Sequence, residues 1–149
     1  MPESNKVIRH SREQISQHEG QATEAILAGQ LVEETGDGGI QLDTGGSPTR
    51  VLVAKDDRDR GMEITDEYEG GELAKYIAVA GGGVNLLLAA GETVDASAEN
   101  RLVPDGNGNV RPFDGANDAA GDEVAVAQED VDNAAGADPV PIATEVSTR

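Results

Sequence analysis

Residues 105–109, Asp-Gly-Asn-Gly-Asn, combine the oxygen-bearing side chains and glycines found in calcium-binding loops. An EF-hand loop starting at Asp105 would need glycine at its sixth position, for a sharp turn, and glutamate at its twelfth, as a bidentate ligand. Val110 and Ala116 occupy those positions. The segment therefore indicates a β-turn, and we predict no metal site there.

Two other segments concentrate carboxylates that could bind hard cations weakly. Residues 56–60 alternate acids with arginines (Asp-Asp-Arg-Asp-Arg), and Asp66, Glu67 and Glu69 follow shortly afterwards. We expect solvated loops, because charged side chains are mostly exposed. A salt-bridged contact between residues 56–60 and a neighbouring subunit is the alternative.

No pattern of catalytic residues is present. His10 and His18 lack the spacing of metal ligands, and without cysteine the chain has no thiol nucleophile, disulfide or Cys-ligated metal. No serine is framed as a nucleophile elbow. The glycines at 36–39 and 81–83 match neither a Walker A loop nor a dinucleotide fingerprint. We predict no enzyme, no cofactor and no metal, although carboxylates paired by folding are invisible in sequence.

The net charge restricts the partners. It is −18, from 29 acidic and 11 basic residues among 149. Binding to nucleic acid depends on Lys and Arg replacing phosphate counterions, and an anionic membrane surface likewise attracts basic segments. We therefore expect neither nucleic acid nor a membrane surface as a partner.

The first twelve residues lack the apolar core of a signal peptide, and the apolar stretch Val84–Ala90 is far too short for a spanning helix.

Two explanations account for so much acid. A charged chain of low hydrophobicity can be disordered, or its surface can be adapted to molar salt, where the Debye length falls to about 3 Å and self-repulsion is screened. Only three lysines are present, and runs of Val, Leu and Ile recur. These features favour a folded protein of a halophilic organism. Its aromatic residues are only Tyr68, Tyr76 and Phe113, so the core is thin and we expect oligomerisation.

The elements that must position these residues are short strands separated by glycine-rich turns. Residues 30–33 and 40–42 flank Gly-Asp-Gly-Gly, which predicts a hairpin. Further strands are expected over 50–54, 61–68, 72–80, 84–89, 93–94, 101–103 and around 110, and residues 22–28 as one helical turn or a loop. This spacing predicts an all-β fold, a small compact sandwich or barrel.

The two ends of the chain differ from its centre. Residues 1–20 are electrically neutral, whereas residues 21–149 hold the whole net charge. We expect an extended N-terminal arm over 1–20, with Val7, Ile8 and Arg9 able to add as a strand to another acidic surface. Residues 21–149 form the β domain, with a mobile loop over 114–122 and C-terminal strands within 123–146, where proline favours a final edge strand.

The order of several segments resembles the head decoration proteins of tailed viruses. The resemblance covers roughly residues 20–146 and rests on short glycine-containing patterns, not on a catalytic signature. The segments are 28–32 (AGQLV), 51–54 (VLVA), 61–68, 71–72, 84–92 (VNLLLAAGE), 102–103, 108–110, 124–130 (VAVAQED) and 141–146 (PIATEV).

The resemblance implies a cement protein that binds the major capsid protein, as a homotrimer at three-fold or quasi-three-fold positions of the shell. It would be made in the host cytoplasm and lie on the outer capsid surface of a virus of halophilic archaea. The residues expected at contacts with the shell or another subunit are Val7, Ile8, Arg9, His10, Arg12, Arg58, Arg60 and Tyr68.

Three alternatives remain open at this point. The chain could be another virion component, such as a turret, fibre base or tail part. It could be a small trimeric β hydrolase of the nucleotide-hydrolase type, with carboxylates from adjacent subunits forming each site. A cell-surface binding module is the third, although no signal peptide is recognised.

Overall fold

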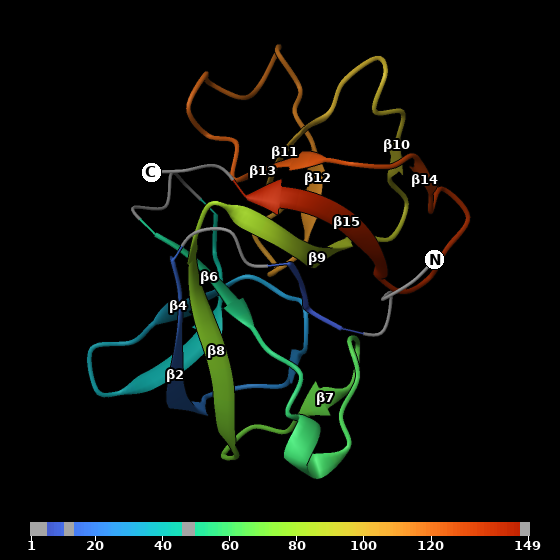
Figure 1. The fold of residues 1–149 in the computed structure, drawn as a ribbon. Coiled ribbons are helices and arrows are strands. Elements are labelled where there is room, and N and C mark those ends of the chain that lie inside the picture. Colours follow the sequence, from blue (N-terminus) through green and yellow to red (C-terminus); the bar gives the residue numbers. More distant parts are fainter. Residues whose placement is uncertain (1–5, 11–13, 46–49, 147–149) are drawn as a thin grey trace.

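The computed structural model describes residues 6–10, 14–45 and 50–146 and is almost entirely β (Figure 1). The predicted all-β fold is confirmed. The strands form an upper and a lower group in the view of Figure 1, and one continuous cluster of buried apolar side chains extends through both groups.

The upper group is a closed five-stranded barrel. Its strand order is β9-β12-β11-β13-β15, and β15 returns to pair with β9 along its whole length. Short strand β1 adds antiparallel to β9, and β10 pairs with β14 beside the barrel. The bounds are β1 (Ile8–His10), β9 (Gly82–Leu88), β10 (Thr93–Val94), β11 (Arg101–Pro104), β12 (Val110–Pro112), β13 (Ala125–Ala127), β14 (Val131–Asp132) and β15 (Val140–Val146).

The lower group is a five-stranded sheet in the order β4-β5-β2-β8-β6. A bridge between Leu31 and Val53 joins its two outer strands, so the sheet curls toward closure. Strands β3 and β7 form a separate pair, and the 3₁₀ turn η1 follows β6. The bounds are β2 (Gln14–Ala22), β3 (Ile26–Leu27), β4 (Val32–Glu34), β5 (Gly39–Leu42), β6 (Val51–Ala54), η1 (Arg58–Arg60), β7 (Glu67–Tyr68) and β8 (Leu73–Ala80).

The connection between the groups runs directly from β8 to β9. Gly81 and Gly82 have φ of 84° and 127°, a region that side chains with a Cβ rarely adopt. These glycines let the chain turn out of one sheet and enter the other within two residues. Every residue of β9 is buried, in agreement with its sequence Gly-Gly-Val-Asn-Leu-Leu-Leu, in which Asn85 is the one polar residue.

Several predicted strands are confirmed and others are shorter. The hairpin forms between β4 and β5, with Glu33 opposite Gln41. Of residues 61–68, only Glu67 and Tyr68 are a strand, because Asp66 accepts a bond from the Glu63 amide and Thr65 has a φ of 76°. Local side-chain bonds of this kind compete with a sheet ladder.

The C-terminal strand is not at an edge, contrary to the prediction from its prolines. β15 lies between β9 and β13. Pro141 is tolerated there because it lies in the half of β15 that pairs with β9 alone, since β13 reaches only Thr144 to Val146.

The described part of residues 1–20 is built into both sheets and does not form the extended arm that we expected. Ile8 pairs with Val84 in the upper barrel, while β2 pairs with β8 along eight consecutive residues of the lower sheet. A neutral, polar sequence concealed this role, because β2 has exposed residues such as Gln17 and Glu19 and too few apolar ones to mark it as a strand.

Candidate interaction surface

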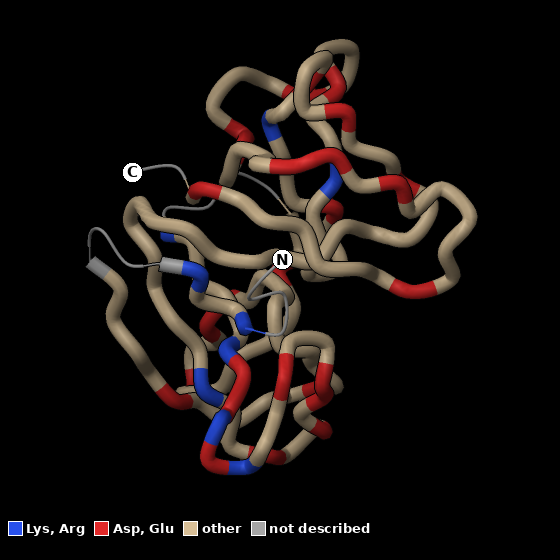
Figure 2. The backbone as a smooth tube through the Cα atoms, turned by 45° about the vertical axis from the view of Figure 1, so that its right-hand side comes forward, with Lys and Arg blue, Asp and Glu red and all other residues tan. Residues whose placement is uncertain are grey.

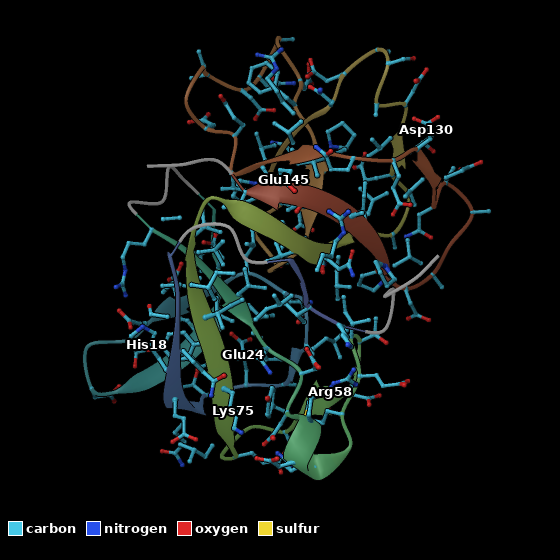
Figure 3. The ribbon with its side chains drawn as sticks, viewed as in Figure 1. His18, Glu24, Arg58, Lys75, Asp130 and Glu145 are labelled. Atoms are coloured by element: carbon cyan, nitrogen blue, oxygen red, sulfur yellow. The ribbon has the colours of Figure 1, made fainter. Side chains whose placement is uncertain are left out.

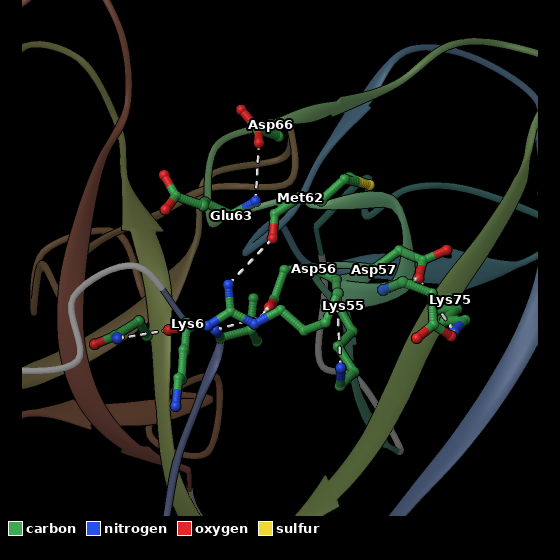
Figure 4. Close-up of polar contacts among 12 residues, drawn as sticks. Lys6, Lys55, Asp56, Asp57, Met62, Glu63, Asp66 and Lys75 are labelled. Atoms are coloured by element: carbon green, nitrogen blue, oxygen red, sulfur yellow. Dashed lines mark hydrogen bonds and ion pairs between the residues drawn. The ribbon is translucent and has the colours of Figure 1, made fainter.

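The N-terminal segment is held by backbone and side-chain bonds to both strand groups (Figure 4). The amide of Val7 donates to Oδ1 of Asp56 at 3.0 Å, on the loop after β6. The amide of Asn85, in β9, donates to the Val7 carbonyl at 2.7 Å, and Asn85 Nδ2 donates to the Lys6 carbonyl at 2.7 Å. Residues 6–8 therefore connect the lower sheet with the upper barrel.

Three of the residues predicted to contact another protein lie in this segment, and the structure uses them internally. The Val7 side chain is fully buried, and Ile8 is half-buried against the core. Arg9 donates from Nη1 to the Thr144 carbonyl of β15 at 3.1 Å. Their backbone is committed to β9 and Asp56, so the strand addition expected of Val7, Ile8 and Arg9 is satisfied within the chain.

Asp56 is the buried anion on which this segment is fixed. Its side chain is 3% exposed, and Oδ2 lies 3.1 Å from Nε of Arg58. Arg58 also donates from Nη1 to the Met62 carbonyl at 3.3 Å. A buried carboxylate needs such partners, because removing a charge from water costs several kcal/mol. The arginine expected at a subunit contact therefore neutralises an acid of its own loop.

Lysine and arginine side chains neutralise the remaining acids of this loop. Lys75 Nζ, on β8, lies 3.2 Å from Asp57 and 3.4 Å from Asp59. The hydrogen bond with Asp57 raises the pKa of Lys75. Arg60 pairs with Glu72 at 2.8 Å, and the pKa of Glu72 is lowered, mainly by the Glu69 amide and further by Arg60.

Tyr68 packs against the loop of residues 55–60 and is fully buried. Its hydroxyl donates to the Lys55 carbonyl at 2.6 Å, and the Arg60 guanidinium lies 5.7 Å from its ring centroid. Burial raises the pKa of Tyr68 to about 12. Arg60 and Tyr68, both expected at a contact with another protein, thus contact each other within the chain.

His10 and Arg12 are the two other residues predicted to contact another protein. The backbone of His10 is in β1, opposite Gly83. Arg12 lies outside the described residues. Neither prediction is tested by the arrangement of the chain.

The lower sheet contains a second cluster of polar side chains, which the sequence did not predict. The rings of His18 and Tyr76, which face each other across β2 and β8, stack at 5.4 Å. The Tyr76 hydroxyl donates to Glu34 at 2.6 Å, and Glu34 pairs with Arg50 at 3.1 Å. Burial raises the pKa of Tyr76 to about 12. These residues come from four strands or their ends, so no local spacing could reveal them.

The Asp105 segment is a turn, as predicted. Oδ1 of Asp105 accepts from the amides of Asn107 and Asn109, and the Asp105 amide donates to the Asn109 carbonyl at 2.9 Å. The carboxylate oxygen therefore stabilises the turn. Within residues 6–10, 14–45 and 50–146, no group of three or more potential ligands that could hold a metal ion is found.

The loops at the far end of the upper barrel are strongly acidic (Figures 2 and 3). Residues 82–149 contain 13 of the 29 acids but only 3 of the 11 basic residues. Arg111 makes a two-point contact with Asp118 at 2.7 Å, which lowers the pKa of that carboxyl to about 2. Arg101 similarly pairs with Glu99 at 2.8 Å and stacks 3.9 Å from the Phe113 ring centroid.

The predicted loop over 114–122 is present, and it is internally bonded. The Asp114 amide donates to Asp118, and Asp114 accepts from the Ala116 amide and the Asn117 side chain. Its mobility remains a prediction. Across the part of the chain that the structure describes, no helix has the length and hydropathy needed to cross a membrane.

Comparison with known proteins identifies a relative in fold only. No protein-family model matches the sequence, and no curated protein is significantly similar to it. Among solved structures, the chain resembles the N base of the head fibre protein gp8.5 of bacteriophage phi29. The superposition has a TM-score of 0.57 at 13% identity and covers 90% of this chain and 95% of that one. The superposition includes most of both chains, and it shows a similarity of fold.

Proposed function

We propose that this chain is a structural protein of a tailed-virus particle, located on the outer surface of the head and bound to the major capsid protein. The observation that supports this most is the fold similarity over 90% of the chain to the base of a phage head fibre. A similarity over 95% of the other domain means that the whole domain corresponds, and not only a common pair of strands.

The contacts within the described chain agree with a structural role. The carboxylates that sequence reasoning considered for cation binding, among residues 56–60, instead bind Val7, Arg58 and Lys75. The arginine and tyrosine side chains of this region have internal partners as well. A structural, non-enzymatic role therefore forms part of the proposal.

Two versions of this function are distinguishable. In the first, the protein is a cement that decorates the shell as trimers at three-fold or quasi-three-fold positions. In the second, it is the base on which a fibre is mounted, which the head-fibre origin of the similar domain favours. Both require binding to the shell, and they differ in the number of copies.

Quantitative mass spectrometry of purified particles tests the proposal. A copy number close to that of the major capsid protein supports the cement, and several dozen copies or fewer support the fibre base. Absence from purified particles would refute both versions.

The salt adaptation is a separate part of the proposal. The net charge of −18 suits a particle assembled in molar salt, where screening allows many acidic copies to lie close together. A virus of halophilic archaea, with the protein made in the host cytoplasm, is the source we infer.

A further inference from the structure

Asn107 and Gly108 form a chemically reactive pair in the turn between β11 and β12. The main-chain nitrogen that follows an asparagine can attack the carbonyl carbon of the asparagine side chain. Glycine hinders this attack least, because it has no Cβ. The chain contains an Asn-Gly pair only once among its 149 residues, and Asn107 is exposed to solvent.

The two reacting groups of this pair are free of hydrogen bonds. Asn107 is held through its main-chain amide, which donates to Oδ1 of Asp105 at 2.7 Å. Across the part of the chain that the structure describes, no hydrogen bond is found to the Asn107 side chain or from the Gly108 amide. No such bond has to break before the nitrogen approaches the side-chain carbon, and the turn keeps the two groups adjacent.

The two other exposed asparagines of the described chain are each followed by an amide that already has an acceptor. The amide after Asn100 donates to Oε2 of Glu99 at 3.0 Å. The amide after Asn117 donates to the Asp114 carbonyl at 2.8 Å, and the Asn117 side chain donates to Oδ2 of Asp114 at 2.7 Å. Asn107 is therefore the described asparagine with the fewest obstacles to attack. The remaining described asparagines are buried: Asn85, Asn109 and Asn133.

We propose that Asn107 is a site of spontaneous deamidation in the folded protein. The Gly108 nitrogen forms a bond to Cγ of Asn107, the Cγ–Nδ2 bond breaks, and the side-chain nitrogen leaves as ammonia with the proton of the glycine amide. Water then opens the resulting five-membered succinimide ring. Attack of water at Cγ gives aspartate, and attack at the main-chain carbonyl carbon gives isoaspartate. Water is the only co-reactant, and both products carry a new negative charge.

The turn that contains this pair connects the upper barrel with the lower sheet. The Leu31 amide donates to the Gly108 carbonyl at 2.7 Å, and Gln30 Nε2 donates to Oδ1 of Asn109 at 3.0 Å. A Cβ on Gly108 would lie only 2.8 Å from Cδ2 of Leu42, so the turn is closely packed. Isoaspartate lengthens the main chain of this turn by one methylene group. We expect it to loosen these contacts between the two strand groups.

Incubation of the full, folded chain in mildly alkaline buffer at molar salt tests the site. Peptide mass spectrometry with electron-transfer fragmentation locates each deamidated asparagine and distinguishes aspartate from isoaspartate. We expect deamidation at Asn107 to be about tenfold or more faster than at Asn100 and Asn117. A rate at Asn107 equal to or below theirs would overturn the inference. The proposed function is unaffected by either result, because the reaction involves this chain and water alone.

Serine variants test the structural consequence. Asn107→Ser removes the reactive side chain from an exposed position, and Asn117→Ser is the matched control at a site expected to react slowly. After incubation, we expect a lower melting temperature for the unaltered chain and for Asn117→Ser, but an unchanged one for Asn107→Ser. Conversion of Asn107 without a fall in melting temperature would overturn the predicted loosening. An equal fall in all three proteins would show that another change causes it.

Discussion

Tyr68 and Tyr76 are the only tyrosines of the chain, and each hydroxyl donates to an acceptor within the fold. Burial raises both pKa values to about 12, whereas an unfolded tyrosine ionises near about 10. A raised pKa contributes stability that is complete below pH about 10 and is lost as the pH rises toward about 12. The fold therefore favours the neutral phenols.

The first prediction is that the folded protein shows little phenolate absorbance at pH 10.5, where the urea-unfolded chain is mostly ionised. An absorbance titration near 295 nm in both states measures this. Ionisation of either tyrosine near pH 10 in the folded protein would show that its hydroxyl is not buried as described.

Loss of the Asp56 carboxylate should destabilise the fold. Removing its carboxylate by Asp56→Ala leaves the Val7 amide and Arg58 without their partner. We expect the free energy of unfolding to fall by about 2–4 kcal/mol, because bonds to a buried charge are worth more than neutral ones. Urea denaturation at constant salt measures the loss.

Asp59→Ala is the matched control for Asp56→Ala. Asp59 is in the same segment, but its side chain is 91% exposed and its contact with Lys75 is 3.4 Å long. Its loss should change the free energy by under about 0.5 kcal/mol. Similar effects of the two variants would contradict the assignment of Asp56 as the residue that fixes the N-terminal segment.

At the scale of elements, the first strand is a structural component and not an arm. Deleting residues 1–9 removes the buried Val7, the β1 pairing with β9 and the bonds to Asp56 and Asn85. Burial of a valine alone contributes about 1.5 kcal/mol or more. We expect a fall in the free energy of unfolding of about 2–5 kcal/mol in denaturant titrations. A deletion variant as stable as the full chain would show that the segment is dispensable for the fold.

The loop before β15 gives the next prediction. Asn133 Nδ2 donates to the carbonyls of Leu88, Ala89 and Asp138, and a Cβ on Gly136 would overlap with Asn133 Oδ1. Gly136→Ala must therefore displace Asn133 and leave buried carbonyls unpaired, at a cost of about 1–3 kcal/mol in thermal or urea unfolding. Gly115→Ala is the control, since its Cβ would lie in ordinary contact, 3.9 Å from Phe113 Cε1. Equal stability of both variants would contradict this role of Asn133.

Sequence patterns predicted elements wherever the signal was local. The glycine-rich turn between 30–33 and 40–42 specified a hairpin, and the long apolar runs became β8 and β9. The pattern failed at β2, whose partner β8 lies more than fifty residues away and supplies much of the apolar surface. It failed again at 61–66, where Asp66 bonds locally to the backbone.

The predicted contact residues show the same limit. Arg60 contacts Tyr68 within the chain, and the sequence could not show that these two side chains are partners of each other. Asp56 was recognised only as one acid among three, since one of its partners, Val7, lies 49 residues away in the sequence.

At the scale of the whole molecule, acid is spread over both strand groups, while basic residues gather mainly in the lower group (Figure 2). With a net charge of −18, raising potassium chloride from 0.1 M to molar levels shortens the Debye length from about 10 Å to about 3 Å. We predict a free energy of unfolding that increases over this range in urea titrations. A stability that stays constant or falls with added salt would contradict adaptation to a saline environment.

The proposed location of this domain is the head of a tailed virus. Antibody labelling of purified, untreated particles in electron micrographs tests it most directly, because the label reports location without any assumption about copy number. If the domain lies there, gold particles will be found over the outer surface of the heads. Label confined to tails, or particles that bind no antibody while the protein stays in the host cell lysate, would contradict it.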